Sequence, residues 1–159
     1  MKKFLFCVCF ILFSFVLSAQ HYQAKVIGVK DGDTVEILYN GLARVVRLAH
    51  IDAPEKNQPY GKKAKQYLSS QCFGQVVEVV VSGRPDRYGR WIAEIFYRNQ
   101  NLNKAMVRKG MAWHFKKYSS DSGYAELESA AKAKRVGLWR QENPVAPWDW
   151  RKQRRELRK

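Results

Sequence analysis

Alternating apolar and polar residues near the start of the chain predict three short β-strands joined by tight turns. In the second of these, Val35, Ile37 and Tyr39 fall on one face. Asp31-Gly32 and Asn40-Gly41 are residue pairs typical of hairpin turns. We therefore predict an antiparallel meander with strands at residues 22–29, Thr34–Tyr39 and Ala43–Leu48.

The rest of the chain reads as two more strands and three helices. Tyr60, Ala64, Leu68 and Cys72 recur every four residues, which is the period of a helix face. The valine-rich run Val76–Val81 is short and β-branched, which favours a strand. The other elements are a strand at Trp91–Tyr97 and helices at Leu102–Arg108 and Tyr124–Arg135. This order predicts an α+β fold class with a mostly β core, a small five-stranded barrel of the OB type with helices added.

The first residues, MKKFLFCVCFILFSFVLSAQ, have the layout of a secretory signal peptide. Two lysines precede an apolar run, and small residues follow it, so we expect residues 1–19 to be removed before Gln20; an uncleaved anchor is the alternative. The domain is then expected over 20–142, with a basic C-terminal tail over 143–159, and the protein is expected to be secreted or periplasmic with no membrane anchor after cleavage. Only Cys72 follows the cut, and we interpret it as a buried structural thiol.

The charge narrows the class of partner. The chain carries 29 Lys and Arg against 14 Asp and Glu, a net charge of +15. Such an excess favours nucleic acid, an anionic polysaccharide or a membrane surface. Six of the last nine residues are Lys or Arg, and we expect them to trail as a flexible arm that adds nonspecific affinity for phosphates. A solvated tail without a role is the alternative, and the tryptophans of APWDW are expected to pack on the barrel.

Five charged residues lie at the ends or inside of the predicted strands. Asp33 opens the second strand, Asp52 and Glu55 follow the third, Arg47 lies within the apolar third strand, and Arg90 precedes the fifth. In a meander, the start of the second strand comes near the end of the third, so the two aspartates could converge. Two carboxylates suit a hard cation such as calcium. A third could orient or deprotonate a water, and two arginines could hold a phosphodiester.

Each of these residues also has an ordinary structural interpretation. Asp33 could cap a turn, Asp52 could belong to a loop, and Glu55 and Arg90 could form a weak surface ion pair. Arg47 is the least ordinary, because a lone Arg in a strand core is costly if it is unpaired. Two other classes of protein stay open at this point: an OB barrel that grips single strands without cutting, and a cationic surface-active protein. The spacing of the three histidines does not indicate zinc.

Several ordered segments resemble the staphylococcal nuclease (thermonuclease) family. They are DGDTV, VRLAHIDAPE, YGKKAKQYL, DRYGRWIA, NKAMVRKGMAW and AKAKRVGLW, spread over residues 22–139. The resemblance implies a five-stranded OB-fold barrel with three helices. It also implies calcium-dependent hydrolysis of DNA and RNA with little sequence specificity, leaving 3′-phosphate ends. Single-stranded nucleic acid is the favoured partner, and the protein is expected to be a monomer.

The resemblance also implies the metal ligands. Asp33 and Asp52 resemble the carboxylate ligands of calcium, and the backbone carbonyl of Ala53 resembles a further ligand. Asp31 resembles an outer neighbour of the ion. The best-known member of the family has a threonine where this chain has Ala53, so the carbonyl is kept but a hydroxyl is lost.

The remaining roles follow in the same way. Glu55 resembles the residue that handles the attacking water, and Arg47 and Arg90 resemble the phosphate-binding pair that stabilises the transition state. Tyr88 and Tyr118 resemble nucleotide contacts. The chain departs from the best-known member in two further places. The loop from Glu55 to Tyr60 is shorter, and Lys116 replaces a tyrosine on the substrate side.

Overall fold

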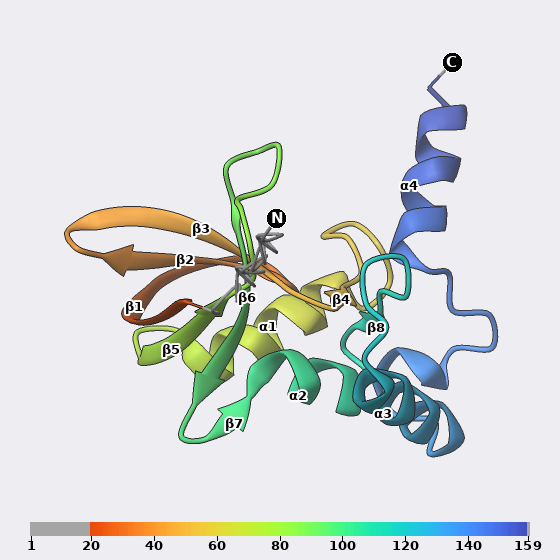
Figure 1. Cartoon of the computed structure of the whole chain (residues 1–159). Helices are drawn as coiled ribbons and strands as arrows, with labels where there is room; N and C mark the ends of the chain where they lie inside the picture. The colour runs from red at the N-terminus through yellow and green to blue at the C-terminus, as the bar shows by residue number, and fades with distance from the viewer. Residues whose placement is uncertain (1–19, 159) are drawn as a thin grey trace, which may run out of the picture.

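Five strands close into a barrel in the computed structural model, which describes residues 20–158 (Figure 1). They follow the order β3-β2-β1-β5-β6, and a parallel pairing of β3 with β6 closes the cylinder. The other pairings are antiparallel. This confirms the predicted five-stranded barrel, whose strands are β1 (Gln20–Asp31), β2 (Thr34–Tyr39), β3 (Leu42–Leu48), β5 (Val76–Val81) and β6 (Trp91–Tyr97).

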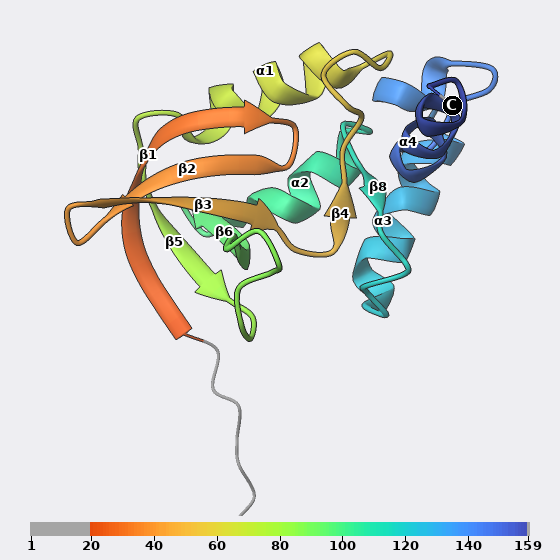
Figure 2. The ribbon, with the colours of Figure 1, turned by 90° about the horizontal axis from the view of Figure 1, so that it is seen from above.

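Helices lie beside the barrel and at one end of it. In the view from above, α1 runs along one side while α3 and α4 lie beyond the end of β3 (Figure 2). Three strands of two residues complete the fold: β4 (Ile51–Asp52) pairs with β8 (Trp113–His114), and β7 (Gln100–Asn101) pairs with β6. The helices are α1 (Gly61–Cys72), α2 (Leu102–Arg108), α3 (Ser122–Ala133) and α4 (Pro147–Glu156), with a short 3₁₀ helix at Gly137–Arg140.

The core forms as the patterns predict. Val35 and Ile37 of β2 are fully buried, and on α1 the residues Ala64, Leu68 and Cys72 point inward. A buried side chain of this kind contributes about 1.5–3 kcal/mol through removal of apolar surface from water. Cys72 is a free, buried thiol whose pKa burial raises to about 12, as the structural interpretation predicts.

Two local predictions are wrong. The two-residue turn between β1 and β2 is Gly32-Asp33, because Asp31 still pairs with Thr34. Asp33 therefore lies in the turn rather than at the start of a strand. The third helix begins at Ser122, two residues before the predicted start, because the Asp121 side chain caps it by accepting a hydrogen bond from the Gly123 backbone at 2.7 Å.

The C-terminal segment also differs from the prediction of a barrel with three helices and a trailing arm. A fourth helix, α4, carries four of the basic residues after Trp150, namely Arg151, Lys152, Arg154 and Arg155. It begins with Pro147 in its first turn, a position that suits proline. Trp148 stacks on Phe115 at 5.4 Å between ring centroids and meets Trp113 edge-on at 5.7 Å. This tryptophan thus packs beside β8, not on the barrel strands.

The signal-peptide prediction concerns residues 1–19, which lie outside the described residues. Among residues 20–158, none of the helices combines the length and the apolar character that a membrane crossing requires.

Candidate active site

The β1–β2 turn brings Asp33 against the start of the loop after β4. A Cβ atom on Gly32 would lie 2.7 Å from the Cβ atoms of both Ala53 and Ala64, so only glycine allows this approach. The turn is closed by the Asp33 backbone N–H, which donates to Asp31 Oδ1 at 3.1 Å. The sequence therefore needs glycine here for space, and the close packing places the Asp33 side chain inside the molecule.

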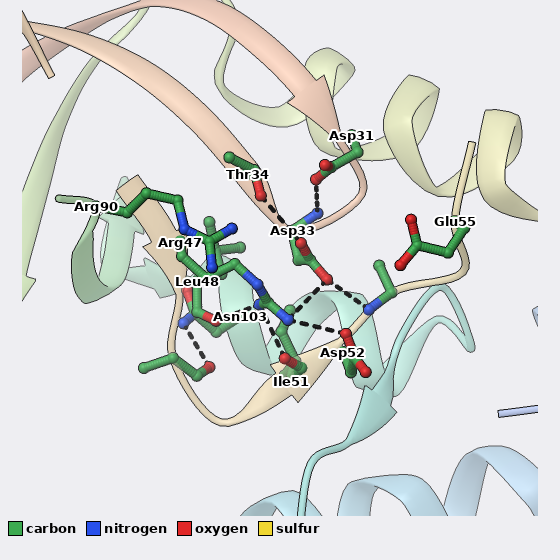
Figure 3. A network of polar contacts seen from close by, with 12 residues as sticks. Asp31, Asp33, Thr34, Arg47, Leu48, Ile51, Asp52, Glu55, Arg90 and Asn103 are labelled. Atoms are coloured by element: carbon green, nitrogen blue, oxygen red, sulfur yellow. Dashed lines mark hydrogen bonds and ion pairs between the residues drawn. The ribbon is translucent and has the colours of Figure 1, made fainter. Parts of the chain in front are cut away.

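Arg47 joins the two aspartates (Figure 3). Its Nη2 lies 3.1 Å from Asp33 Oδ2 and 2.9 Å from Asp52 Oδ1. Its Nη1 donates to the backbone carbonyls of Leu48 and Ile51 at 2.8 and 2.9 Å. The structure thus brings Asp33 and Asp52 together as the meander suggests, and the arginine inside β3 has the anionic partners that its position requires.

Buried negative charge dominates the centre of the site. Asp33 and Asp52 are 6% and 1% exposed. The Asp33 carboxylate also accepts from the Ala53 backbone N–H at 2.6 Å. Even so, burial raises the pKa of Asp33 to about 7, and the charges of Asp31 and Asp52 add to this effect while Arg47 opposes it. The cost of burying the charge therefore outweighs the attraction of Arg47, and the Asp33 carboxyl takes up a proton below about pH 7.

Glu55 lies on the compact loop between β4 and α1, close to Asp52 (Figure 3). The Gln58 backbone N–H donates to the Glu55 carbonyl at 2.8 Å, and the Gly61 N–H donates to the Gln58 carbonyl at 2.9 Å. A Cβ on Gly61 would lie only 1.9 Å from the Glu55 carbonyl oxygen, so a glycine at this position allows the loop to fold back. The Glu55 side chain accepts a hydrogen bond from Arg151 of α4 at 2.6 Å.

Arg90 lies at the edge of the site. Figure 3 draws it beside Arg47, but its guanidinium pairs with Asp86 at 2.8 Å rather than with the central carboxylates. Tyr88 and Tyr118 are 67% and 70% exposed. The Arg87 guanidinium lies over the Tyr88 ring at 4.7 Å from its centroid. Both tyrosines present ring surface to solvent, and both have a cationic neighbour, since the Lys117 Nζ lies 5.4 Å from the centroid of the Tyr118 ring.

The comparisons with known proteins decide the family. The family model described as "Staphylococcal nuclease homologue" matches residues 45–141. An "Uncharacterized endonuclease" of Haemophilus influenzae is 41% identical over 156 residues, which cover 96% of this chain and 86% of the relative. The chain belongs to the staphylococcal nuclease family. A "Micrococcal nuclease" of Shigella flexneri is 37% identical over 142 residues, which cover 82% of this chain and 81% of that protein.

As a member of the staphylococcal nuclease family, the protein is a nuclease, a phosphodiester hydrolase. Family membership therefore decides against the alternative of an OB barrel that only binds nucleic acid. The matched region ends at residue 141, so α4 lies beyond the part of the chain that the family model describes.

The donor set of this nuclease fits a calcium ion better than a transition metal. Within residues 20–158, no group of three or more His, Cys, Asp or Glu side chains is arranged to hold a metal ion. An ion at this site would therefore depend on two carboxylates and on oxygen donors other than side chains. Asp33 and Asp52 offer two carboxylates, and calcium completes its shell with backbone carbonyls and water. The raised pKa of Asp33 is the observation that fits a cation, because a divalent charge would favour ionisation of this buried group.

Sequence reasoning missed three residues of this nuclease that shape the site. Asn103 is fully buried on α2 and donates to the Ala49 and Ala93 carbonyls at 3.0 Å, which ties the turn after β3 to β6. Gln58 and Arg151 hold the loop of Glu55. For Asn103 the sequence does contain a signal, because this polar residue lies among the apolar residues of a predicted helix. The other two lie among polar residues, where no local signal separates them from solvated side chains.

The departures from the family pattern also have visible consequences. The Ala53 methyl group fills the space beside Gly32, so a larger side chain would crowd this turn. Lys116 does not replace the tyrosine as a stacking group. Its Nζ lies 3.9 Å from Glu128 Oε2, and its side chain is mostly exposed.

Proposed function

We propose that the protein is a calcium-dependent nuclease that hydrolyses DNA and RNA with little sequence specificity and leaves 3′-phosphate ends. Single-stranded nucleic acid is its favoured substrate. The observation that supports this most is the pairing of two buried carboxylates, Asp33 and Asp52, with a single guanidinium at about 3 Å. A binding module would gain nothing from buried carboxylates, because they repel phosphates unless a cation is present.

In this proposal Asp33, Asp52 and the backbone carbonyl of Ala53 are the residues that would hold the calcium ion. When bound, the ion supplies a Lewis acid that stabilises negative charge on a phosphate oxygen. Asp31 adds negative charge near the ion, since it is one of the groups that raise the pKa of Asp33. The protein's contribution is a dry, fixed pair of carboxylates whose oxygens are held by the Ala53 N–H and by Arg47.

The side chains around the ion would carry the chemistry. Glu55 orients the attacking water and accepts its proton, and its partly exposed carboxylate is open to solvent. Water attacks phosphorus and the bond to the 5′-oxygen breaks, which leaves a 3′-phosphate and, after the leaving oxygen takes a proton from water, a 5′-hydroxyl. Arg47 and Arg90 hold the phosphate oxygens and neutralise the charge that develops. For this, Arg90 must exchange its partner Asp86 for the substrate.

The surface around the site suits a polyanion. The net charge of +15 attracts phosphates over a distance set by the ionic strength. Tyr88 and Tyr118 offer exposed rings on which unpaired bases stack, a contact that tolerates any base and favours single strands. Weak sequence specificity follows from this combination of phosphate contacts and stacking.

The test is cleavage of single-stranded DNA and RNA by the purified protein with calcium, with a chelator, and with magnesium in place of calcium. We expect cleavage only with calcium, and products whose 3′ ends need phosphatase before they can be extended. Arg47→Ala and Glu55→Ala should lower the rate by about 100-fold or more. Arg44→Ala, on the exposed face of the same strand, is the matched control. Rapid cleavage by either active-site variant would contradict these roles.

We further propose that the protein acts as a monomer outside the cytoplasm, after removal of residues 1–19. The measurement is the N-terminal sequence of the protein recovered from the periplasmic and extracellular fractions. A chain that begins at Gln20 supports this proposal, and a chain that keeps residues 1–19 in every fraction contradicts it.

A further inference from the structure

A third arginine reaches the proposed active site from the C-terminal helix. Arg151 Nη2 lies 2.6 Å from Asp52 Oδ2, and its Nη1 lies 2.6 Å from Glu55 Oε1 and 3.3 Å from Asp52 Oδ1. One guanidinium therefore spans the two carboxylates. Charge-assisted contacts of this length are among the strongest side-chain hydrogen bonds. The helix that supplies Arg151 lies beyond residues 45–141, the part matched by the family model.

The first turn of α4 is fixed to the domain, which gives Arg151 a defined position. Ala146 and Pro147 are buried at the start of the helix. Trp148 stacks on Phe115 with the two rings nearly parallel, at an interplanar angle of 4°. Arg151 follows one turn later on the same helix, so its guanidinium extends from an anchored backbone. A detachable basic arm would lack this packing.

The same C-terminal segment holds Glu55 through a second, independent contact. The Glu55 backbone N–H donates to Gln58 Oε1 at 3.0 Å, and Gln58 Nε2 donates to the Val145 carbonyl at 2.7 Å. The Gln58 side chain is buried, so this bridge is shielded from water. The segment thus fixes both the backbone and the carboxylate of Glu55. A residue that only blocked the site would need the contact with the Glu55 carboxylate but not the Gln58 bridge.

The formal charges of the site sum to a net negative value even with Arg151 included. With Asp33 ionised, which a bound cation would favour, Asp31, Asp33, Asp52 and Glu55 bring four negative charges, and Arg47 and Arg151 bring two positive ones. The two charges that remain match one divalent ion. By formal charge a divalent ion and Arg151 are compatible, and both would share Asp52, whose two carboxylate oxygens Arg151 contacts.

We infer that Arg151 is a positioning residue of the nuclease reaction. This inference rests on the proposed function, in which Glu55 orients the attacking water. It holds the Glu55 carboxylate beside Asp52, so that the water is oriented when the substrate arrives. Misplacing a reacting group by about 1 Å can cost about 100-fold in rate. The C-terminal helix is then a part of the active site and not a separate tail.

The experiment compares Arg151→Ala and Arg151→Lys with Arg154→Ala, an exposed arginine on the same helix. We measure kcat and KM with single-stranded DNA, calcium affinity of the substrate-free protein by calorimetry, and thermal unfolding. Arg151→Ala should lower kcat by about 10- to 100-fold with a smaller change in KM. Arg151→Lys should recover part of this loss, and so should guanidinium ions added to Arg151→Ala. Arg154→Ala should keep the wild-type kcat.

A double-mutant cycle separates positioning from general support of the fold. In the Glu55→Ala background, Arg151→Ala should cost little further activity, because the group that it positions is already gone. Where Arg151→Ala fails to fold, Arg151→Lys and the same cycle with lysine provide the test.

Three outcomes would overturn the inference. They are a wild-type kcat in Arg151→Ala, a loss of the same size in the Glu55→Ala background, and a higher kcat with tighter calcium binding in Arg151→Ala. The last would make Arg151 an internal cation that competes with the metal. Failure of the wild-type protein to cleave nucleic acid would instead contradict the proposed function itself.

Discussion

The raised pKa of Asp33 predicts how the stability of the metal-free protein depends on pH. In the unfolded chain this carboxyl has its usual pKa of 3.8, whereas burial and the neighbouring carboxylates raise it to about 7 in the folded protein. Below the lower value both states carry the proton and the group does not oppose folding. As the pH rises toward the higher value, the unfolded state ionises first, so the protein loses stability over this range.

The largest loss follows from the two pKa values. A difference of about 3 units, at about 1.4 kcal/mol per unit, corresponds to about 4 kcal/mol once the pH exceeds 7. The substitution Asp33→Asn removes the ionisation but keeps an oxygen that can accept from the Ala53 N–H. It also keeps a polar partner for the Thr34 hydroxyl, which lies 3.1 Å from Asp33 Oδ1. The variant should therefore be more stable than the wild type at neutral pH, by up to about 4 kcal/mol.

The assay is urea unfolding in a chelator at about pH 5 and about pH 8, for the wild type and Asp33→Asn. The free-energy difference between the two proteins should grow in favour of the variant as the pH rises, and this comparison cancels other titrating groups. Glu126→Gln, an exposed carboxylate on α3, is the control for net charge. Added calcium should stabilise the wild type more than the variant. A free-energy difference of the same size at both pH values would show that the ionisation of Asp33 does not oppose folding.

Two further predictions concern the packing behind the site. Gly32→Ala places a methyl group 2.7 Å from the Cβ atoms of Ala53 and Ala64, so it should destabilise the protein by about 1–3 kcal/mol in urea unfolding and weaken calcium binding in calorimetry. The control is Gly41→Ala, whose added methyl group has no atom within 4 Å and should leave calcium binding unchanged. Asn103→Ala removes a buried amide that satisfies two backbone carbonyls and one N–H, so it should cost about 2–4 kcal/mol in the same assay, and an equal stability would contradict this account.

The sequence pattern predicts the long elements well because their signals are local. β2, β5, β6 and α2 have the predicted bounds, since each combines a clear hydrophobic pattern with turn residues at its ends. The two-residue strand β4 gives no such signal. It exists because β8 lies opposite, and that partner follows about 60 residues later in the chain. Strands of two residues, such as β4 and β8, are too short for a hydrophobic pattern and were therefore missed.

The same distinction explains which active-site residues the sequence could reveal. Arg47 lies within an apolar strand, and a buried guanidinium demands an anionic partner, so its position predicts an anion nearby; the structure supplies Asp33 and Asp52. Arg151 lies in a run of basic residues that is typical of a solvated tail. The packing of Trp148 on Phe115 and Trp113 fixes the rotation of α4 and thereby selects which arginine faces the site. A charge that must be compensated can thus be read from sequence, whereas a charge selected by helix orientation requires the structure.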